Sequence, residues 1–381
     1  ILRTTQIKQI WITTRPLMQR QLEDELGCFA FNFEPFSRAE QVEVLSRIWL
    51  TDINPLEPSM VLKAKNYARS LIDRLMASTS IHSKALTSIP LTTNLLAYKF
   101  KTDFQQSIEQ EVMPVGYSEK VTILDLYDHF ISSTYETYCL EKANMCLESE
   151  AAKEIKAAAI ETFDNQLELF AIKELFSPTI INKLNFPLDL LSSSSRLAQI
   201  GFLEVRSNKL RFIHASFTEY FASCWLYKNH NNPLLKSLVA RLLKIEMSLD
   251  ISLVHQFFDL KLVKGLPLHT EVVFHDSRAL VNCIGMHPER GFIDSVDVIG
   301  RTALHLAAAY GYSDSVLQLL NHGANYKIRD NLLGWSAQGY AMQAQHWEAV
   351  NALLERDIAS GLISEKVIDP SPHRKETLLH I

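Results

Sequence analysis

Two side chains with useful chemistry stand shortly after apolar segments of the chain. Arg15 follows the segment Ile7 to Trp11, whose β-branched residues predict a short buried strand. Its planar guanidinium could bind phosphate oxygens through several donors, or it could pair with a surface carboxylate. His214 stands between the apolar pair Phe212-Ile213 and the start of a helix, where it could cap that helix or bond a core carbonyl.

A hairpin and a helix are expected to position His214. The segment Val205 to Leu210 predicts a tight hairpin with Ser207-Asn208 as its polar tip. The helix is expected to begin at Ser216, because Glu219 three residues later completes the pattern of a capping box. Apolar residues at strand and helix spacing are Leu203, Val205, Leu210, Phe212, Phe217, Tyr220, Phe221, Cys224 and Trp225. These elements together predict a winged-helix unit.

The pattern Phe-Ile-His-x-Ser-Phe-x-Glu-Tyr-Phe-Ala, from Phe212 to Ala222, resembles the winged-helix signature of NACHT-type STAND signalling NTPases. The resemblance implies that His214 reaches the phosphates of a bound nucleotide and holds the protein in its closed state. It is an implication of the family pattern, and helix capping stays open as the alternative for this residue.

Two earlier segments resemble the same family. Trp11 to Pro16 is similar to the sensor strand of the NACHT core, which implies that Thr14 and Arg15 lie near the terminal phosphate. Pro90 opens a predicted helix, and the resemblance implies that it packs against the adenine base. Proline is also ordinary at a first helical turn. Pro90 therefore supports the family resemblance only because it lies between Arg15 and His214, in the order that the family shows.

Apolar residues at steps of three and four predict a helical bundle around these landmarks. After an expected strand within Cys28 to Phe36, Ser37 and Glu40 form a capping-box pattern. Long helices are expected from Val121 to Lys142 and over residues 148–175, and two further helices from Leu234 to Leu243 and from Ile251 to Leu262. The core stripes of the first two helices are Val42, Leu45 and Trp49, then Val61, Ala64, Ala68, Leu71 and Leu75.

The C-terminal part of the chain contains an internal repeat. Asp297 to Ala308 resembles the opening of an ankyrin repeat, and Gly334-Trp335-Ser336-Ala337 follows at an offset of 34 residues. The ankyrin period is 33, so one residue is inserted. A degenerate repeat is expected at 278–298, and a further one is expected to begin at Lys375. Hydrogen bonding between Thr302 and His305 is expected to set the first helix of a repeat, which makes His305 and His380 structural residues.

Composition excludes some classes of function. The 381 residues carry a net charge of -5. The chain therefore lacks the excess of basic residues that would indicate nucleic-acid binding. The scattered cysteines, at positions 28, 139, 146, 224 and 283, form no Cys-x-x-Cys pair and offer no zinc site. The longest uncharged apolar run contains Pro90 and is too short to span a bilayer. Since the chain begins at Ile1, we expect it to be a fragment of a longer protein.

The expected fold is mainly α with short β elements. We expect the end of an α/β nucleotide-binding core at 1–36, a helical domain at 37–112, a winged helix at 113–228, a helical connector at 229–265, and an α-solenoid of ankyrin repeats at 266–381. The function implied is part of a cytoplasmic ATP/ADP-dependent switch, with Mg²⁺ in the full-length protein. Its repeats would bind a protein partner and relieve autoinhibition, and its NACHT region would self-associate. The alternative is an ankyrin scaffold whose NTPase-like region is not catalytic.

The first prediction concerns nucleotide binding by this chain. Residues 1–381 contain no Gly-x-x-x-x-Gly-Lys-Ser/Thr motif, whose backbone N–H groups and lysine cradle phosphates. We therefore expect no ATPase activity and no tight ATP binding by residues 1–381, which isothermal titration calorimetry and a phosphate-release assay would measure. A micromolar affinity for ATP would contradict this expectation.

Overall fold

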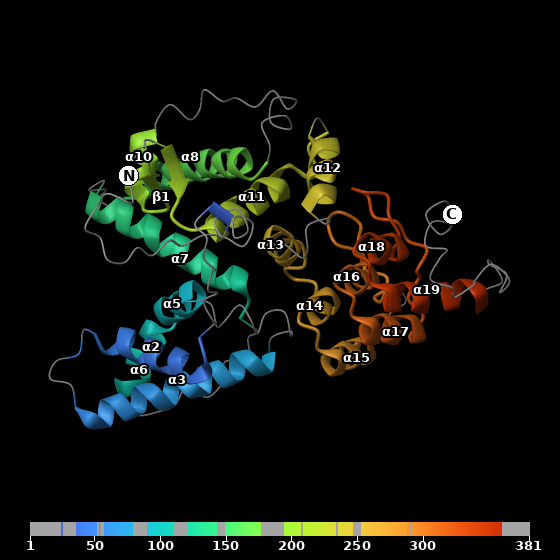
Figure 1. The fold of residues 1–381 in the computed structure, drawn as a ribbon, viewed down its shortest axis with the longest axis horizontal. Helices are drawn as coiled ribbons and strands as arrows, with labels where there is room; N and C mark the ends of the chain where they lie inside the picture. The colour runs from blue at the N-terminus through green and yellow to red at the C-terminus, as the bar shows by residue number, and fades with distance from the viewer. Residues whose placement is uncertain are drawn as a thin grey trace.

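The protein is mainly helical, with one short two-stranded sheet in the part that the structure describes (Figure 1). The computed structural model describes residues 24–25, 36–51, 53, 57–78, 90–109, 121–142, 149–176, 194–206, 209–233, 235–246, 253–287, 289 and 291–359. The strand expected at Ile7–Trp11 lies outside these residues, and so does the repeat expected from Lys375. Of the segment Cys28 to Phe36, in which a second strand is expected, only Phe36 is described.

Four helices form the first group: α2 (Arg38–Leu50), α3 (Pro58–Ser78), α5 (Pro90–Lys99) and α6 (Lys101–Glu109). The predicted capping box is confirmed, because Ser37 and Glu40 accept each other's backbone N–H groups at the start of α2. The Trp49 indole stacks on Phe104 with ring centroids 5.0 Å apart, and its N–H donates to the carbonyl of Ala97 at 2.7 Å. This one side chain therefore ties α2 to α5 and α6.

The second group begins with α7 (Ile123–Thr137) and α8 (Glu150–Leu175). The single α-helix expected up to Lys142 is wrong at its end, because Tyr138–Lys142 is a π-helix. The wider turn allows the adjacent residues Tyr138 and Cys139 both to be buried. The Tyr138 ring packs edge-on against Phe163 of α8 at 5.5 Å. The irregular turn thus packs the end of α7 against the next helix.

The predicted hairpin is confirmed by the pairing of β1 (Leu203–Arg206) with β2 (Lys209–Phe212) after α10 (Ser194–Ile200). The antiparallel register places Arg206 opposite Lys209, while the tip between them lies outside the described residues. Leu203 and Phe212 are buried, whereas Val205 is exposed because it faces away from the core. The next helix, α11 (Ala215–Asn229), packs along α8 and carries the expected apolar face.

Helices α12 (Lys236–Glu246) and α13 (Leu253–Leu262) confirm the expected connector helices. Buried side chains from Val42 in α2 to Leu262 in α13 belong to one continuous hydrophobic cluster. The first two helical groups and the connector therefore share a core. In Figure 1, α13 lies between α11 and the repeat region.

The repeat region consists of helix pairs stacked side by side (Figure 1). The pairs are α14 (Pro267–Val273) with α15 (Ser277–Met286), α16 (Ala303–Tyr310) with α17 (Ser313–Asn321), and α18 (Ala337–Gln343) with α19 (Trp347–Ala359). The preceding repeat expected at 278–298 therefore begins earlier, at the α14 helix. The predicted Thr302–His305 contact is confirmed, with the Thr302 backbone N–H donating to His305 Nδ1 at 3.1 Å.

A carboxylate organises each of the two loops between successive helix pairs. Asp297 accepts the backbone N–H groups of Ile299 and Arg301. Asp330 accepts those of Leu332, Leu333 and Trp335 in the next loop. The backbone closes from Asp297 to Arg301 in the first loop and from Asp330 to Trp335 in the second. The residue inserted between the two repeats thus lies inside the second loop.

The second prediction compares two glycines of the repeat region. A Cβ atom at Gly300 (φ +85°) would lie 2.9 Å from the backbone nitrogen of Asn331, whereas one at Gly323 (φ +90°) would meet nothing within 4 Å. Both alanine variants incur the left-handed backbone penalty of about 1–2 kcal/mol. Gly300→Ala should cost about 1–3 kcal/mol more, because it also pushes the two loops apart. Chemical denaturation checks this, and equal losses in the two variants would contradict it.

Candidate functional site

The structure describes two of the four residues expected to contact a nucleotide. Thr14 and Arg15 lie outside the described residues. Pro90 is the exposed first residue of α5, and His214 precedes the first residue of α11. Both helices rest on α7. Phe130 of α7 contacts Tyr98 of α5 with ring centroids 6.1 Å apart, and it contacts Phe217 of α11 at 5.8 Å.

His214 is the N-cap of α11, so the expectation that this helix begins at Ser216 is wrong. The helix begins at Ala215, and the backbone N–H of Ser216 donates to His214 Nδ1 at 3.2 Å. The imidazole nitrogen thus satisfies one of the donors that a helix start leaves unpaired, as a serine oxygen would at an ordinary cap. The capping function considered for His214 is therefore what the geometry shows. Ser216 is buried inside the first turn.

A short hydrogen-bond relay fixes the tautomer of His214. The Tyr127 hydroxyl donates to Ser216 Oγ at 2.6 Å, and Ser216 Oγ lies 2.7 Å from His214 Nδ1. Burial raises the pKa of Tyr127 to about 12, so its hydroxyl keeps its proton at neutral pH. Because Nδ1 accepts the backbone N–H of Ser216, the neutral ring carries its proton on Nε2. The exposed His214 side chain therefore has an Nε2–H donor in a set orientation.

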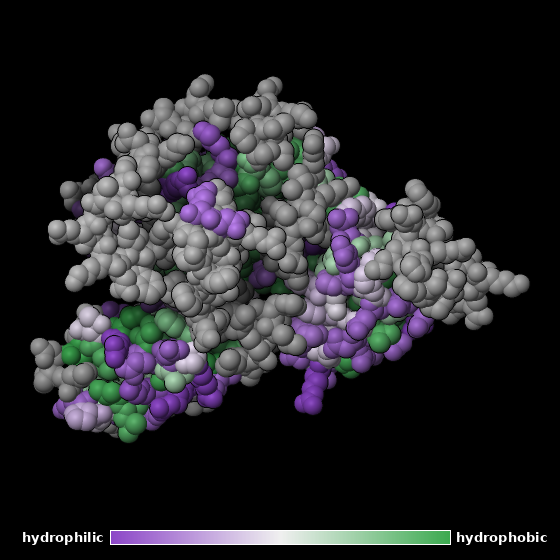
Figure 2. Space-filling view, viewed as in Figure 1, coloured by the Kyte–Doolittle hydropathy of each residue, from purple (hydrophilic) through white to green (hydrophobic). Residues whose placement is uncertain are grey.

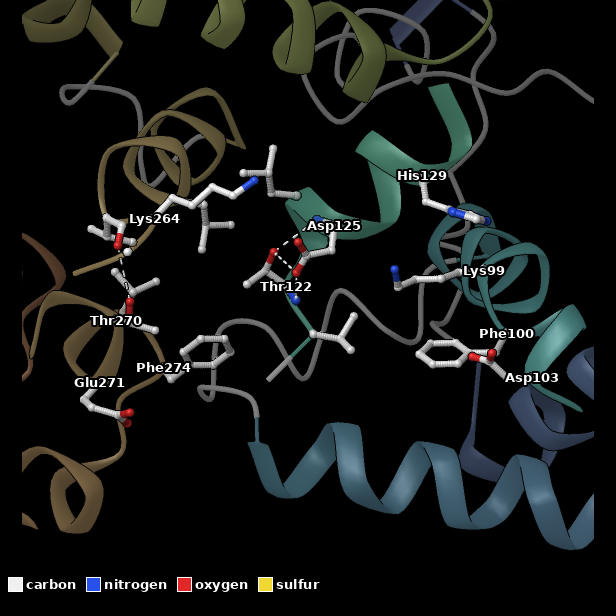
Figure 3. Close-up of a pocket in the computed structure, with 16 residues that line it drawn as sticks. Lys99, Phe100, Asp103, Thr122, Asp125, His129, Lys264, Thr270, Glu271 and Phe274 are labelled. Atoms are coloured by element: carbon white, nitrogen blue, oxygen red, sulfur yellow. Dashed lines mark hydrogen bonds between the residues drawn. The ribbon is translucent and has the colours of Figure 1, made fainter. Parts of the chain in front are cut away.

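A cavity of about 880 Å³ lies between the α5–α6 junction, the start of α7 and the α13–α14 turn (Figure 3). Thr122 and Asp125 stand in its middle and hydrogen-bond each other as the capping box of α7. Lys99 lies on one side of the cavity and Lys264 on the other. Its 16 lining residues include neither Pro90 nor His214, the two predicted nucleotide contacts that the structure describes.

A cluster of buried charges lies where the connector meets the repeats. The Arg301 guanidinium, 4% exposed, forms ion pairs with Asp259 of α13 at 2.7 Å and with Asp297 at 2.9 Å. The Tyr310 hydroxyl donates to the second oxygen of Asp259 at 2.9 Å. Burial alone would lower the pKa of Arg301, but the two carboxylates outweigh it and raise the pKa above its ordinary value. Arg301 is therefore charged and doubly paired.

Sequence reasoning missed the Asp259–Arg301 pair. Its one visible signal is the isolated carboxylate of Asp259 within the apolar run Phe257-Phe258-Asp259-Leu260, since a charge on a buried helix face requires a partner. The sequence does not identify that partner. Arg301 stands between Gly300 and Thr302, at the opening of the repeat motif, and nothing in its neighbours indicates burial.

Apolar side chains from both loops between the helix pairs are buried against the helical groups. Ile299 from the first loop and Leu332 from the second belong to the hydrophobic cluster of the helical groups. On the face seen in Figure 2, the repeat region is mostly hydrophilic, with scattered hydrophobic side chains. Among its exposed apolar residues are Leu317 on α17 and Trp347 on α19. The loops thus offer less surface to a partner than they would in a free-standing stack.

Comparison with known proteins identifies the repeats. The family described as ankyrin repeats (3 copies) matches residues 268–362. A segment of 60 residues is 47% identical to part of the potassium channel AKT2/3 of Arabidopsis thaliana, covering 16% of this chain and 7% of that protein. The likeness to the channel therefore concerns a small part of each chain. Residues 268–362 are ankyrin repeats, and repeats of this class suggest a protein-binding role.

The described residues offer neither a metal cluster nor a membrane-spanning helix. None of the described residues form a group of three or more histidine, cysteine or carboxylate side chains that could hold a metal ion. Within the same ranges, no helix has the length and apolar character needed to cross a membrane.

The third prediction concerns the pH dependence that His305 gives to the repeats. Burial, and then the nearby Arg301 cation, lower the pKa of His305 to about 4. Its Nδ1 accepts the Thr302 N–H, and its Nε2 lies 3.2 Å from the Trp335 carbonyl. The unfolded chain binds this proton with an ordinary histidine pKa near 6.5, so stability should fall as the pH drops from about 6.5 towards 4.

His305→Gln is the matched variant, because glutamine at this helix position can keep the capping box but does not titrate. Between pH 6.5 and pH 5, the wild type should lose on the order of 1–2 kcal/mol more unfolding free energy than the variant. Urea denaturation at the two pH values measures this difference. The same loss in both proteins would show that His305 does not titrate on unfolding.

Proposed function

We propose that this chain belongs to a NACHT-type STAND signalling switch that is controlled by ATP or ADP and Mg²⁺. In this proposal the ankyrin repeats bind a protein partner, which relieves autoinhibition and lets the NACHT region self-associate in the cytoplasm. Residues 113–228 act as its winged-helix domain. The proposal is supported by the ordered landmarks Thr14-Arg15-Pro16, Pro90 and His214, by the hairpin that precedes α11, and by the ankyrin repeats at 268–362.

The orientation of His214 is the observation that carries this proposal. The residue stands between β2 and α11, and the Tyr127–Ser216 relay leaves its proton on Nε2. An imidazole N–H is the donor that a phosphate oxygen accepts, and hydrogen bonds to charged groups contribute roughly 1.5–3 kcal/mol. A residue that only caps the helix would have no need of a histidine, since serine or asparagine caps at least as well.

A bound nucleotide would supply phosphate charges that differ between the ATP and ADP states. His214 would donate to them, Thr14 and Arg15 would bind the terminal phosphate, and Pro90 would pack against the base. A switch operates only if the nucleotide binds one conformation better than the other, and His214 would provide part of that difference. Residues 1–381 contain no Gly-x-x-x-x-Gly-Lys-Ser/Thr motif, so the proposal requires a phosphate-binding loop outside these residues and is tested on a protein that contains both.

A scaffold function is the second candidate, and the Asp259–Arg301 pair favours it. This pair fixes the repeats on the helical region without any nucleotide. In that case the NTPase-like region would only support the repeats, and His214 would serve as a cap alone. The two candidates predict different behaviour for variants of His214.

The fourth prediction uses two variants of His214. Both His214→Ala and His214→Asn remove the Nε2–H donor, but asparagine is a good N-cap and alanine is not. If His214 donates to phosphate, ADP should dissociate about ten- to a hundred-fold faster from both variants. The loss of the cap should lower stability by about 0.5–2 kcal/mol in His214→Ala alone.

The ADP off-rate and the melting temperature are measured on the same preparations. Faster ADP release from both variants, together with ligand-independent self-association, is the result expected of the switch. An off-rate equal to that of the wild type in His214→Asn would remove the nucleotide function of His214. A lower melting temperature confined to His214→Ala would then leave capping as its function.

A further inference from the structure

Helix α13 has two buried faces that contact different parts of the molecule. Phe257 and Asp259 are two positions apart, so their side chains project on roughly opposite sides of the helix. Both are buried. Phe257 faces the helical groups, and Asp259 faces the repeats. A helix that is buried on two sides lies between its neighbours and contacts both.

The first face of α13 packs against α11 and α7 through aromatic contacts. The Phe257 ring lies 4.9 Å from Tyr127 of α7 and 5.4 Å from Tyr220 of α11, measured between centroids. One turn further, the Lys261 ammonium lies over the Tyr220 ring at 4.8 Å. Tyr127 is the same residue that donates to Ser216 in the His214 relay. The first face is therefore linked to the helix start that His214 caps through Tyr127.

The second face of α13 holds the repeats through Asp259. One carboxylate oxygen pairs with Arg301, and the other accepts the Tyr310 hydroxyl. The Arg301 backbone carbonyl lies 2.9 Å from His269 Nε2, on the first helix of the preceding repeat. Asp259 thus binds a point where two repeats and the intervening loop meet. The buried carboxylate of Asp259 would be left uncompensated without Arg301, which is strongly unfavourable. The ion pair is therefore either fully formed or broken.

We infer that α13 is a coupling element, which makes the opening of the repeats and the loosening of α11 a single event. A disturbance at Arg301 releases Asp259, which frees α13, and the packing of Phe257 on Tyr127 and Tyr220 then loosens. Coupling of this kind is reciprocal, so a change at α11 also reaches the repeats. The biological use of the coupling rests on the proposed function, but the coupling itself requires no nucleotide.

Hydrogen exchange on the 381-residue chain tests this inference with Asp259→Asn. Asparagine keeps the shape of the side chain but removes the charge that pairs with Arg301. We expect amides in α13, α16 and α11 to exchange about tenfold faster or more, although the mutated side chain makes no hydrogen bond to α11. Glu355→Gln, which neutralises an exposed carboxylate on α19, is the matched control and should change none of these helices.

A milder variant covers the case in which Asp259→Asn does not fold. Tyr310→Phe removes only the hydroxyl that donates to Asp259, and it should accelerate exchange in the same three helices to a smaller extent. Faster exchange in α13 and α16 with α11 unchanged, in whichever variant folds, would overturn the inference. That result would leave the ADP release expected of the His214 variants untouched, so the two proposals fail separately.

Discussion

The structure depends on one buried cation, the guanidinium of Arg301. Taking a charged group out of water costs several kcal/mol, and only close partners offset that cost. Asp297 is such a partner within the repeat, where it also holds the backbone of its loop. Asp259 is the other partner and comes from the connector. The burial of Arg301 therefore forces the connector and the repeats to meet at one defined position.

The position of Arg301 affects both parts of the proposed function, partner binding by the repeats and nucleotide contact by His214. The repeats can bind a partner only with the surface that the connector and the helical groups leave open, because Ile299 and Leu332 already lie in the shared core. On the other side of α13, Tyr127 supports the relay that orients His214. The repeats, which are proposed to bind a protein, and the predicted nucleotide contact His214 are thus linked through α13.

The sequence predicts the local structure well, since local rules decide it. Ser37 with Glu40, Ser207-Asn208 between two strand-like segments, and Thr302 with His305 are signals contained within a few residues, and the structure shows the elements that they predict. The cap of α11 differs from the prediction, because Ser216 matches the usual capping pattern but the ring nitrogen of His214 accepts the backbone N–H at the helix start. The π-helix after Thr137 brings Tyr138 against Phe163 of α8, a long-range contact that no spacing in α7 reveals.

The long-range pair between Asp259 and Arg301 could not be predicted for a similar reason. A carboxylate in an apolar helix indicates that some partner exists, but many cations of the chain could supply it. Only the stacking of the repeats and the position of α13 bring Arg301 within reach. For His214 the sequence suggests two functions, and the structure describes the capping geometry of one of them.

Scanning calorimetry of the 381-residue chain tests the central claim most directly, namely that the connector joins the helical region and the ankyrin repeats into one cooperative unit. A single heat-absorption peak, with calorimetric and van't Hoff enthalpies in agreement, is the result expected of coupled regions. Two separate transitions, one for the helical region and one for the repeats, would contradict the claim.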